Sequence, residues 1–340
     1  MRKTERDFSR FKNDLIELMG EHGPGPADSE VYSDMLYNIG LLRQENLDLS
    51  ELRLLNTAFK ELRYALKVFK PYRAIPKAAV FGSARTPKNH PAFKMAREFG
   101  KKIVKKGWMI ITGGASGIME AAMIGAGAQN SFGLNILLPF EQNANAVIMG
   151  NQKLIFFKYF FTRKLMFLKE SQATVLFPGG FGTFDEGFES FTLVQTGKAK
   201  PRPIVLVDTP GSRFWSGAIH FFDSHMRKEG WISPNDLSLL RHFHDPQEAV
   251  DDVAGFYANY DSSRFLKDRY LVRVRKPISA AALETINTRF KDILSGGRFE
   301  RLDDVTEDDN KDLSLHRIVF RFDRSSYARL RQLVDHVNTL

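Results

Sequence analysis

Cysteine is absent from this 340-residue sequence, which excludes disulfides, thiolate catalysis and cysteine-based metal sites. Histidine is sparse as well, with eight residues in the chain. His242 and His244 are close in sequence but lie in a polar stretch with no partner motif, so we expect them in a solvated loop. The sequence therefore predicts neither a metal site nor a cofactor.

Long apolar runs are also lacking. The aromatic run over residues 155–161 is short and contains Lys158, so it is not a membrane-span candidate. The first six residues are charged and lead into an amphipathic helical pattern, which is not the pattern of a signal peptide. We expect no membrane contact and a cytoplasmic location.

Two familiar nucleotide-binding loops are missing, namely the G-x-G-x-x-G pattern and the G-x-x-x-x-G-K-[ST] loop, which disfavours an NAD enzyme or an ATPase. The net charge of +9 and the pI near 9.5 favour acidic ligands. The basic residues are nevertheless spread among 40 acidic ones, with no aromatic stacking motif. A solvated surface with one anion site is the favoured interpretation, and nucleic acid is not an expected partner.

Three regions differ in their hydrophobic pattern. Residues 1–74 predict an N-terminal helical extension, with apolar stripes interrupted by the Gly-Pro repeat at 23–26. Residues 75–262 alternate short apolar runs with amphipathic stretches, which predicts an α/β domain. Residues 263–340 predict a small α+β module of βαββα order.

The α/β region predicts a doubly wound, Rossmann-like parallel sheet. Its strands are expected at 78–81, 108–112, 132–138, 173–177 and 203–207, with helices between them. In such sheets a ligand binds beyond the carboxyl ends of the strands. The turns at Gly82, Gly113 and Gly179 all fall there, so three loops are expected to converge on one crevice.

The stretch 177–189 is the most informative, since an apolar strand runs into a glycine turn and then into a helix. We expect the glycines to adopt positive φ and approach a ligand, and Thr183 to cap the helix. The helix amides would then face an anion such as phosphate. Asp185 and Glu186 are expected in the first helical turn, where the helix dipole alone would explain acidic residues. A carboxylate beside a phosphate site costs electrostatic energy and needs a reason, so Glu186 is the sharper candidate for a functional residue.

The segment Pro178-Gly-Gly-Phe-Gly-Thr-Phe-Asp-Glu186 resembles the PGGxGTxxE signature of the LOG ("lonely guy") family, Rossmann-like enzymes similar to nucleoside-monophosphate phosphoribohydrolases. The pair Arg163-Lys164 matches a second family element, although an exposed surface arginine is the alternative. Agreement continues at 80–85, 112–121 and 133–136, so the resemblance covers roughly residues 75–260.

The resemblance implies hydrolysis of the N-glycosidic bond of nucleoside 5′-monophosphates, AMP-like or cytokinin riboside monophosphates, to free base and ribose 5-phosphate. It implies Glu186 and Arg163 as catalytic residues, with Arg163 also holding Glu186 ionised, and a homodimer or larger homo-oligomer. The implied phosphate site comprises Gly179, Gly180, Gly182 and Thr183. The other implied substrate-binding residues are Gly82, Ser83, Arg85, Gly113, Gly114, Gly117, Glu120, Asn135, Gln142, Asn145 and Lys164.

Some positions leave alternatives open. Asn135, Gln142 and Asn145 are equally well explained as turn formers. Thr162 is expected to cap the helix that carries Arg163. Shorter family members have Met-His where this chain has Phe160-Phe161, and often methionine at Phe167, so base specificity is open.

In the C-terminal module we expect a strand over 270–275, a helix capped by Ser279 and ended by Gly296-Gly297, then further strands at 299–302 and 316–322 and a final helix. Four arginines can share the solvent side of its sheet: Arg273, Arg275, Arg317 and Arg321. An effector or partner site on this face is one hypothesis, and a solvated or dimerising face is the alternative.

Two other functions stay open for the whole chain. A non-catalytic nucleotide-binding or carrier protein would use the same anion site. An amino-acid decarboxylase would need a pyridoxal site with a Schiff-base lysine, for which Lys164 is the candidate without a supporting pattern.

Overall fold

The computed structural model describes residues 26–138, 144–303, 308 and 312–340. The chain divides into two compact units, residues 1–60 and 61–340. The helix expected before residue 26 and the predicted site residue Gln142 lie outside the described residues. The domain boundaries expected at 74 and 262 stay predictions.

Helices make up the described part of the first unit, as expected. They are α2 (Pro26–Leu42) and the beginning of α3 (Leu49–Phe69), which continues into the second unit. The last turns of α3 bury Ala65 and Phe69, and the Phe69 ring stacks on Phe132 at a centroid distance of 4.3 Å. The end of α3 is therefore part of the core of the second unit.

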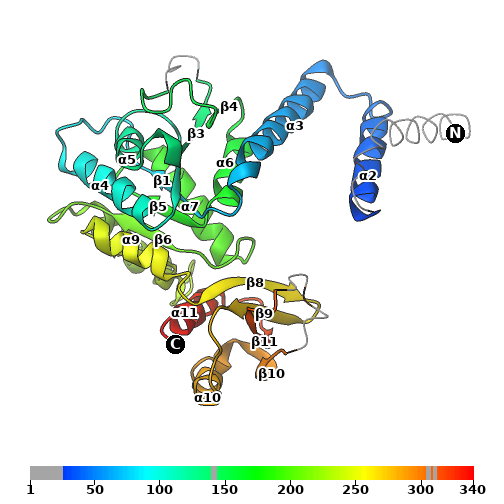
Figure 1. Cartoon of the computed structure of the whole chain (residues 1–340), viewed down its shortest axis with the longest axis vertical. Coiled ribbons are helices and arrows are strands. Elements are labelled where there is room, and N and C mark those ends of the chain that lie inside the picture. Colours follow the sequence, from blue (N-terminus) through cyan, green and yellow to red (C-terminus); the bar gives the residue numbers. More distant parts are fainter. Residues whose placement is uncertain (1–25, 139–143, 304–307, 309–311) are drawn as a thin grey trace, which may run out of the picture. The chain divides into compact units, whose positions relative to one another are not determined.

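A seven-stranded parallel sheet forms the centre of the second unit (Figure 1), with strand order β4-β3-β2-β1-β5-β6-β7. All of its six strand pairings are parallel. Its strands are β1 (Lys77–Phe81), β2 (Met109–Thr112), β3 (Ser131–Ile136), β4 (Leu154–Phe157), β5 (Ala173–Leu176), β6 (Ile204–Val207) and β7 (Leu240–Phe243). The order reverses between β1 and β5, which confirms the doubly wound, Rossmann-like fold.

Helices cover both faces of this sheet because successive strand residues point to opposite sides. One core contains Val80, Ile110 and Val175 and is covered by α4 (Pro91–Lys105), α5 (Ile118–Ala126) and α9 (Pro246–Gly255). The other core contains Ala79 and Ile111 and is covered by α6 (Phe160–Glu170), α7 (Phe181–Gln195) and α8 (Phe214–Phe221). Helix α8 continues as a π-helical segment at Phe222–Arg227. No helix among the described residues is long and apolar enough to cross a bilayer.

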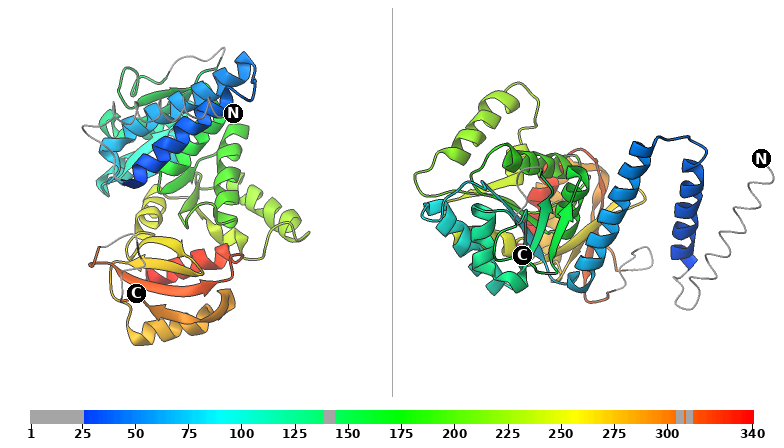
Figure 2. Two further views of the ribbon diagram at one scale, coloured as in Figure 1. Left: turned by 90° about the vertical axis from the view of Figure 1, so that its right-hand side faces the viewer. Right: turned by 90° about the horizontal axis from the view of Figure 1, so that it is seen from above.

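The C-terminal module contains a second, antiparallel sheet with order β10-β11-β9-β8 (Figure 2). Its elements are β8 (Tyr260–Leu266), β9 (Arg269–Val274), α10 (Ala280–Arg289), β10 (Leu294–Arg301), β11 (His316–Phe322) and α11 (Tyr327–Val337). Both helices pack on the same face of the sheet, since Ile286, Val334 and Phe320 share one core.

Two details of this module differ from the prediction, and one agrees with it. β8 was not predicted, so the order is ββαββα. The expected helix end at Gly296-Gly297 is wrong, because α10 ends at Arg289 and both glycines lie within β10. Ser279 does cap α10, accepting a hydrogen bond from the Ala282 amide at 3.1 Å.

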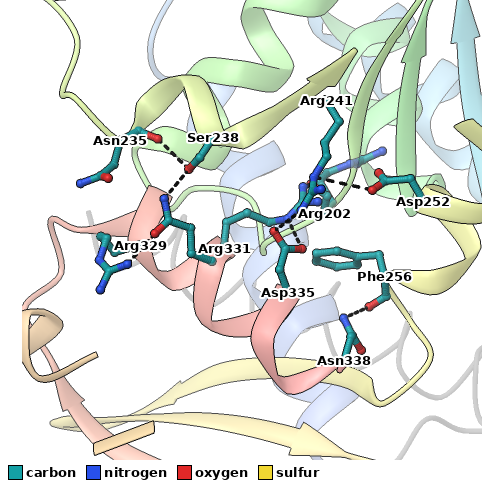
Figure 3. Close-up of polar contacts among 11 residues, drawn as sticks. Arg202, Asn235, Ser238, Arg241, Asp252, Phe256, Arg329, Arg331, Asp335 and Asn338 are labelled. Atoms are coloured by element: carbon teal, nitrogen blue, oxygen red, sulfur yellow. Dashed lines mark hydrogen bonds and ion pairs between the residues drawn. The ribbon is translucent and has the colours of Figure 1, made fainter. Parts of the chain in front are cut away.

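α11 is fixed to the α/β part of the same unit by buried arginines (Figure 3). Arg331 is 1% exposed, donates from Nη1 to the carbonyl of Arg202 at 2.9 Å, and stacks on Phe256 at 4.5 Å. The Arg202 side chain donates in turn to the Leu168 carbonyl at 3.0 Å and to Ser171 Oγ at 2.6 Å. Burial lowers the pKa of Arg202 to about 10. These contacts join the two sheets of the unit through α11.

The four arginines of the second sheet do not form one solvent-exposed face, so that expectation is wrong. Arg273 and Arg317 are each 4% exposed, and their Nε atoms donate to Asp308 Oδ2 at 2.9 and 2.7 Å. Asp308 comes from the acidic segment before β11 and is itself buried. Arg275 and Arg321 pair separately with aspartates, Asp261 at 2.8 Å and Asp268 at 3.4 Å. Most of this charge is therefore already neutralised within the module.

Candidate active site

Three loops at the carboxyl ends of β1, β2 and β5 meet, as predicted. The Ser83 amide donates to the Pro178 carbonyl, and the Ile118 amide donates to the Ser83 carbonyl, both at 3.0 Å. The β1 loop is thus hydrogen-bonded to the loops on either side of it. Gly82, Ser83, Gly113, Gly114, Gly117 and Gly179 all lie in this junction.

In the 178–183 turn, close packing requires glycine only at Gly179. Positive φ occurs at Gly114 and Gly117, but not at Gly179, Gly180 or Gly182, so the predicted positive φ in this turn is wrong. A Cβ on Gly179 would lie 2.8 Å from the Ser83 nitrogen and would overlap the Thr183 hydroxyl. A Cβ on Gly180 or Gly182 would meet no atom within 4 Å. These two glycines leave open space at the start of α7.

The N-terminus of α7 carries unpaired polar groups. The helix begins at Phe181 with Gly180 as its N-cap and no side-chain cap, so the expected cap by Thr183 is wrong. The amides of Thr183 and Phe184 donate to the Gly180 carbonyl. Among the described residues, the amides of Phe181 and Gly182 and the Thr183 hydroxyl have no hydrogen-bond partner. Two free amides at the positive end of a helix suit an anion.

Glu186 lies in the second turn of α7, and not in the first as expected. The two neighbouring acids differ in burial, since the Glu186 side chain is 8% exposed and that of Asp185 is 54% exposed. The helix dipole acts mainly on the first turn, so it gives little reason for a carboxylate here. Burial of Glu186 needs another explanation.

Two cations from α6 face Glu186. Arg163 Nη2 lies 3.4 Å from Glu186 Oε1, and Lys164 Nζ lies 3.4 Å from Glu186 Oε2. Lys164 also pairs more closely with Asp185 at 2.8 Å and with Glu189 at 2.9 Å. The Arg163 side chain is only 13% exposed, so the alternative of an exposed surface arginine is wrong.

In the cluster of Glu186, Arg163 and Lys164, the effect of burial on the Glu186 carboxylate outweighs that of the two cations. Burial raises the pKa of Glu186, and the opposing effects of Lys164 and Arg163 do not cancel that rise. The expectation that Arg163 holds Glu186 fully ionised is therefore too simple. Burial also lowers the pKa of Arg163, whose Nε is buried with no hydrogen-bond partner among the described residues. The unpaired Arg163 Nε beside a carboxylate whose two cations lie at 3.4 Å can still form a hydrogen bond with a polar ligand.

α6 is positioned by a residue that sequence reasoning missed. Glu61 of α3 accepts from the Lys158 amide and from the Thr162 hydroxyl, both at 2.6 Å. α6 begins at Phe160 with Tyr159 as its N-cap, so the expected cap by Thr162 is wrong. The Glu61 carboxylate instead stabilises this helix end. No local signal marks Glu61, because its partner Thr162 is 101 positions away.

Other predicted residues support the loops. Asn145 donates from Nδ2 to the carbonyls of Gly114 and Ala115 at 3.1 and 3.0 Å, and Asn135 donates to the Gly113 carbonyl at 3.2 Å. Both asparagines are 7% exposed. Their amides are used to shape the β2 loop, which favours the turn-forming alternative for these two residues.

Arg85 and Glu120 lie apart from the charged cluster. The Arg85 side chain is exposed, and its amide donates to Ser83 Oγ at 3.1 Å. Glu120 pairs with Lys88 of the β1 loop at 3.0 Å. No contact in the described part of the chain joins either residue to Glu186.

The fold and this geometry define a Rossmann-like protein with two free amides at a helix start and a buried carboxylate on that same helix. Residues 116–253 match the model of the family described as "Possible lysine decarboxylase". A cytokinin riboside 5′-monophosphate phosphoribohydrolase of Mycobacterium tuberculosis is 27% identical over 165 residues, which is 46% of this chain and 82% of that protein. Its Arabidopsis thaliana counterpart is 26% identical over 172 residues, 49% of this chain and 76% of that protein. The resemblance to the LOG family is thereby confirmed for the α/β part of the chain.

Solved structures of two proteins are similar to about half of this chain. The molybdenum cofactor carrier protein of Chlamydomonas reinhardtii is 26% identical and covers 53% of this chain and 95% of its own, with a TM-score of 0.37. DNA processing protein A of Helicobacter pylori is 15% identical and covers 55% of this chain and 82% of its own, with a TM-score of 0.38.

Proposed function

We propose that this protein hydrolyses the N-glycosidic bond of nucleoside 5′-monophosphates, AMP-like or cytokinin riboside monophosphates, and releases the free base and ribose 5-phosphate. The names of the relatives support this reaction class. The observation that carries the proposal is the placement of free amides and a buried carboxylate on one helix. Phe181 and Glu186 are five residues apart on α7, which is about 7.5 Å along a helix and of the order of the span of a ribose 5-phosphate.

The 5′-phosphate would bind at the start of α7. The amides of Phe181 and Gly182 and the Thr183 hydroxyl are the donors, and the positive end of the helix favours the charge. Gly180 and Gly182 leave room for the phosphate oxygens, while Gly179 lets the β1 loop approach. The ribose then extends along α7 toward Glu186.

Glu186 would act on the anomeric carbon. As the C1′–N bond breaks, positive charge develops at C1′ and the ring oxygen, and a fixed carboxylate stabilises it. The water oxygen bonds to C1′, Glu186 accepts a proton from that water, and the electron pair of the broken bond leaves with the base. The base takes up a proton from solvent water, and Glu186 then releases its proton to solvent. A raised pKa makes Glu186 a better proton acceptor than an ordinary glutamate.

Arg163 would orient both Glu186 and the substrate. Its Nη2 reaches Glu186, while the unpaired Nε can donate to a sugar hydroxyl or to phosphate. The guanidinium stacks against the rings of Phe160 at 5.0 Å and Phe167 at 5.8 Å, which fixes its plane. These phenylalanines occupy the positions where base specificity is open.

The surroundings of Lys164 argue against decarboxylation through a Schiff base. An imine-forming lysine must lose its proton, and enzymes favour this by desolvation or by a nearby cation. Lys164 instead lies near three carboxylates, and its pKa is raised because Asp185 and Glu189 outweigh the effect of burial. This lysine is best suited to hold Asp185, Glu186 and Glu189 together.

We also propose a homodimer or larger homo-oligomer formed through α6 and α7. Both helices expose large apolar side chains, with Phe161 at 53%, Leu165 at 50% and Phe188 at 41% exposure. The double substitution Phe161→Glu with Leu165→Glu is expected to give a monomer in light scattering. An unchanged mass would contradict an interface on this face.

The activity is tested with a panel of purine, pyrimidine and N6-substituted purine monophosphates, followed by chromatography of the free base and ribose 5-phosphate. The variant is Glu186→Gln, and the matched control is Glu248→Gln on the exposed side of α9. Release that stops in the Glu186 variant and persists in the control supports the proposal. Tight nucleotide binding without release would instead identify a nucleotide-binding or carrier protein.

A further inference from the structure

A second polar cluster lies at the carboxyl edge of the main sheet, away from Glu186. Asp208 directly follows β6, His242 lies on β7, and His244 comes just after β7 ends. In the register of these parallel strands Leu206 pairs with His242 and Val207 with Phe243. Alternation along the strands therefore places Asp208, His242 and His244 on one face. The expectation of a solvated loop is wrong for His242, which lies on β7, whereas His244 lies beyond the strand and is exposed.

The three side chains converge on one oxygen. His242 Nε2 lies 2.8 Å and His244 Nδ1 lies 2.9 Å from Asp208 Oδ1. The two imidazole rings are 4.5 Å apart and inclined by 65°, and the three candidate ligand atoms all lie within 4.8 Å of one another. Two nitrogens and one carboxylate oxygen are thus close enough together to ligate one ion.

The surroundings hold the carboxylate and leave one side open. Asp208 Oδ2 accepts from the Trp215 amide at 3.2 Å, and the Asp208 amide donates to the Phe243 carbonyl at 3.2 Å. The Asp208 side chain is fully buried, that of His242 is 16% exposed, and that of His244 is 47% exposed. A second contact that fixes a ligating carboxylate is typical of metal sites, and the exposed side gives water access to a fourth position.

From this geometry we propose that Asp208, His242 and His244 bind a divalent transition-metal ion such as zinc, with water completing the coordination. Two imidazoles with one carboxylate suit such ions better than magnesium or calcium, which prefer oxygen ligands. In a tetrahedral site with bonds of about 2.1 Å, neighbouring ligand atoms are about 3.4 Å apart. The histidine nitrogens need to move away from Oδ1 by only about half an ångström to reach that spacing.

The metal would take the place of the contacts that now join the histidine nitrogens to Asp208 Oδ1. The ion would link the ends of β6 and β7 and, through Trp215, the beginning of α8. Trp215 packs against Phe184 of α7 at 5.6 Å, which connects the site to the helix that carries Glu186. Its expected role is to stabilise this edge of the sheet.

The test uses the full chain, freed of metal by a chelator and then titrated with Co²⁺, whose visible absorption reports nitrogen and oxygen ligation. We expect one ion per chain, displaced by Zn²⁺, and a higher melting temperature with Zn²⁺. His244→Gln should weaken binding by about a hundredfold or more, because the loss of outer contacts alone costs 10- to 100-fold. His316→Gln, an exposed histidine on β11, is the matched control and should bind as the wild type does.

His244 is the position to change first, because its side chain is exposed and its replacement removes little buried packing. Equal Co²⁺ binding and equal Zn²⁺ stabilisation in the wild type and in His244→Gln would overturn the proposal. Absence of binding by the wild type would also overturn it, and the cluster would then be a hydrogen-bonded histidine–aspartate group. Neither result depends on hydrolase activity.

Discussion

Two buried arginine–carboxylate groups in this molecule are paired very differently. In the C-terminal module, Asp308 accepts from the Nε atoms of Arg273 and Arg317 at 2.9 and 2.7 Å. In the α/β part, Glu186 has its two cations at 3.4 Å each, and Arg163 keeps a buried Nε without a partner among the described residues. A closely paired arginine–carboxylate cluster stabilises the fold, whereas a loosely paired one can still form hydrogen bonds with a ligand.

The largest expected effect is on turnover at Glu186. Glu186→Gln keeps the shape of the side chain but removes the charge and the proton acceptor, so we expect kcat to fall by about a thousandfold. The free energy of unfolding should stay equal or rise near neutral pH, since burial of this carboxylate is costly. Chemical denaturation beside the activity assay measures both. A variant that loses stability as well would indicate a structural ion pair.

The opposite pattern is expected at Asp308. Asp308→Asn leaves two buried arginines partly uncompensated, which should lower the free energy of unfolding by about 3 kcal/mol. Turnover per folded molecule should not change. Asp268→Asn is the matched control, because its pair with Arg321 is exposed on both sides and contributes little. Equal unfolding of the two variants would contradict the structural role of Asp308.

A smaller change is expected for Arg163→Lys. Lysine keeps the charge but loses the planar contact with Phe160 and Phe167 and the second donor direction. We expect kcat/KM to fall by about 10- to 100-fold because positioning is impaired. Steady-state kinetics with AMP measure this. An unchanged kcat/KM would show that Arg163 contributes only its charge.

The pH dependence follows from the direction of the Glu186 shift. The carboxylate must be ionised to act, so kcat/KM should rise with pH through a pKa above that of an ordinary glutamate. For stability the sign is opposite: a raised folded-state pKa stabilises the protein at low pH, and this contribution is lost as pH rises through it. Glu186→Gln should remove that loss. An acid limb at or below the ordinary glutamate value would refute the assignment.

The smallest effect is expected at Glu61. Glu61→Gln keeps one of the two accepting oxygens and removes the charge at the start of α6, so we expect a loss of about 1 kcal/mol in stability. A modest rise in KM should accompany it, because α6 carries Arg163. Thermal unfolding and steady-state kinetics measure the two effects. Glu51→Gln, near the start of α3, is a control with its own local capping contact, and it should leave KM unchanged.

The sequence predicted the buried centre of the fold better than its edges. β1, β2, β3, β5 and β6 are short apolar runs, and each is buried along its whole length. β7 and β8 were missed because Leu240–Phe243 and Tyr260–Leu266 contain charged or hydroxyl side chains and lie at sheet edges. An edge strand needs less apolar surface, so its pattern resembles that of a loop.

The candidate site was predictable only where its residues lie in local motifs. Glu186 and Arg163 were found through sequence motifs, and the structure brings them together. Glu61 and Asp208 were missed because their hydrogen-bond partners lie 101 and 34 positions away in the sequence, and no local pattern contains both partners. Helix starts were misplaced by three residues at α6 and α7, because neither helix uses the threonine that was expected to cap it.

The most direct test of this account is the time course of adenine and ribose 5-phosphate formation from AMP by the wild type, with adenosine as the comparison substrate and Glu186→Gln as the control. The account predicts equal amounts of both products from AMP, far slower release from adenosine because it lacks the phosphate, and almost none with the variant. Equal release from AMP by the wild type and by Glu186→Gln would contradict the central claim that this loosely paired carboxylate performs the hydrolysis.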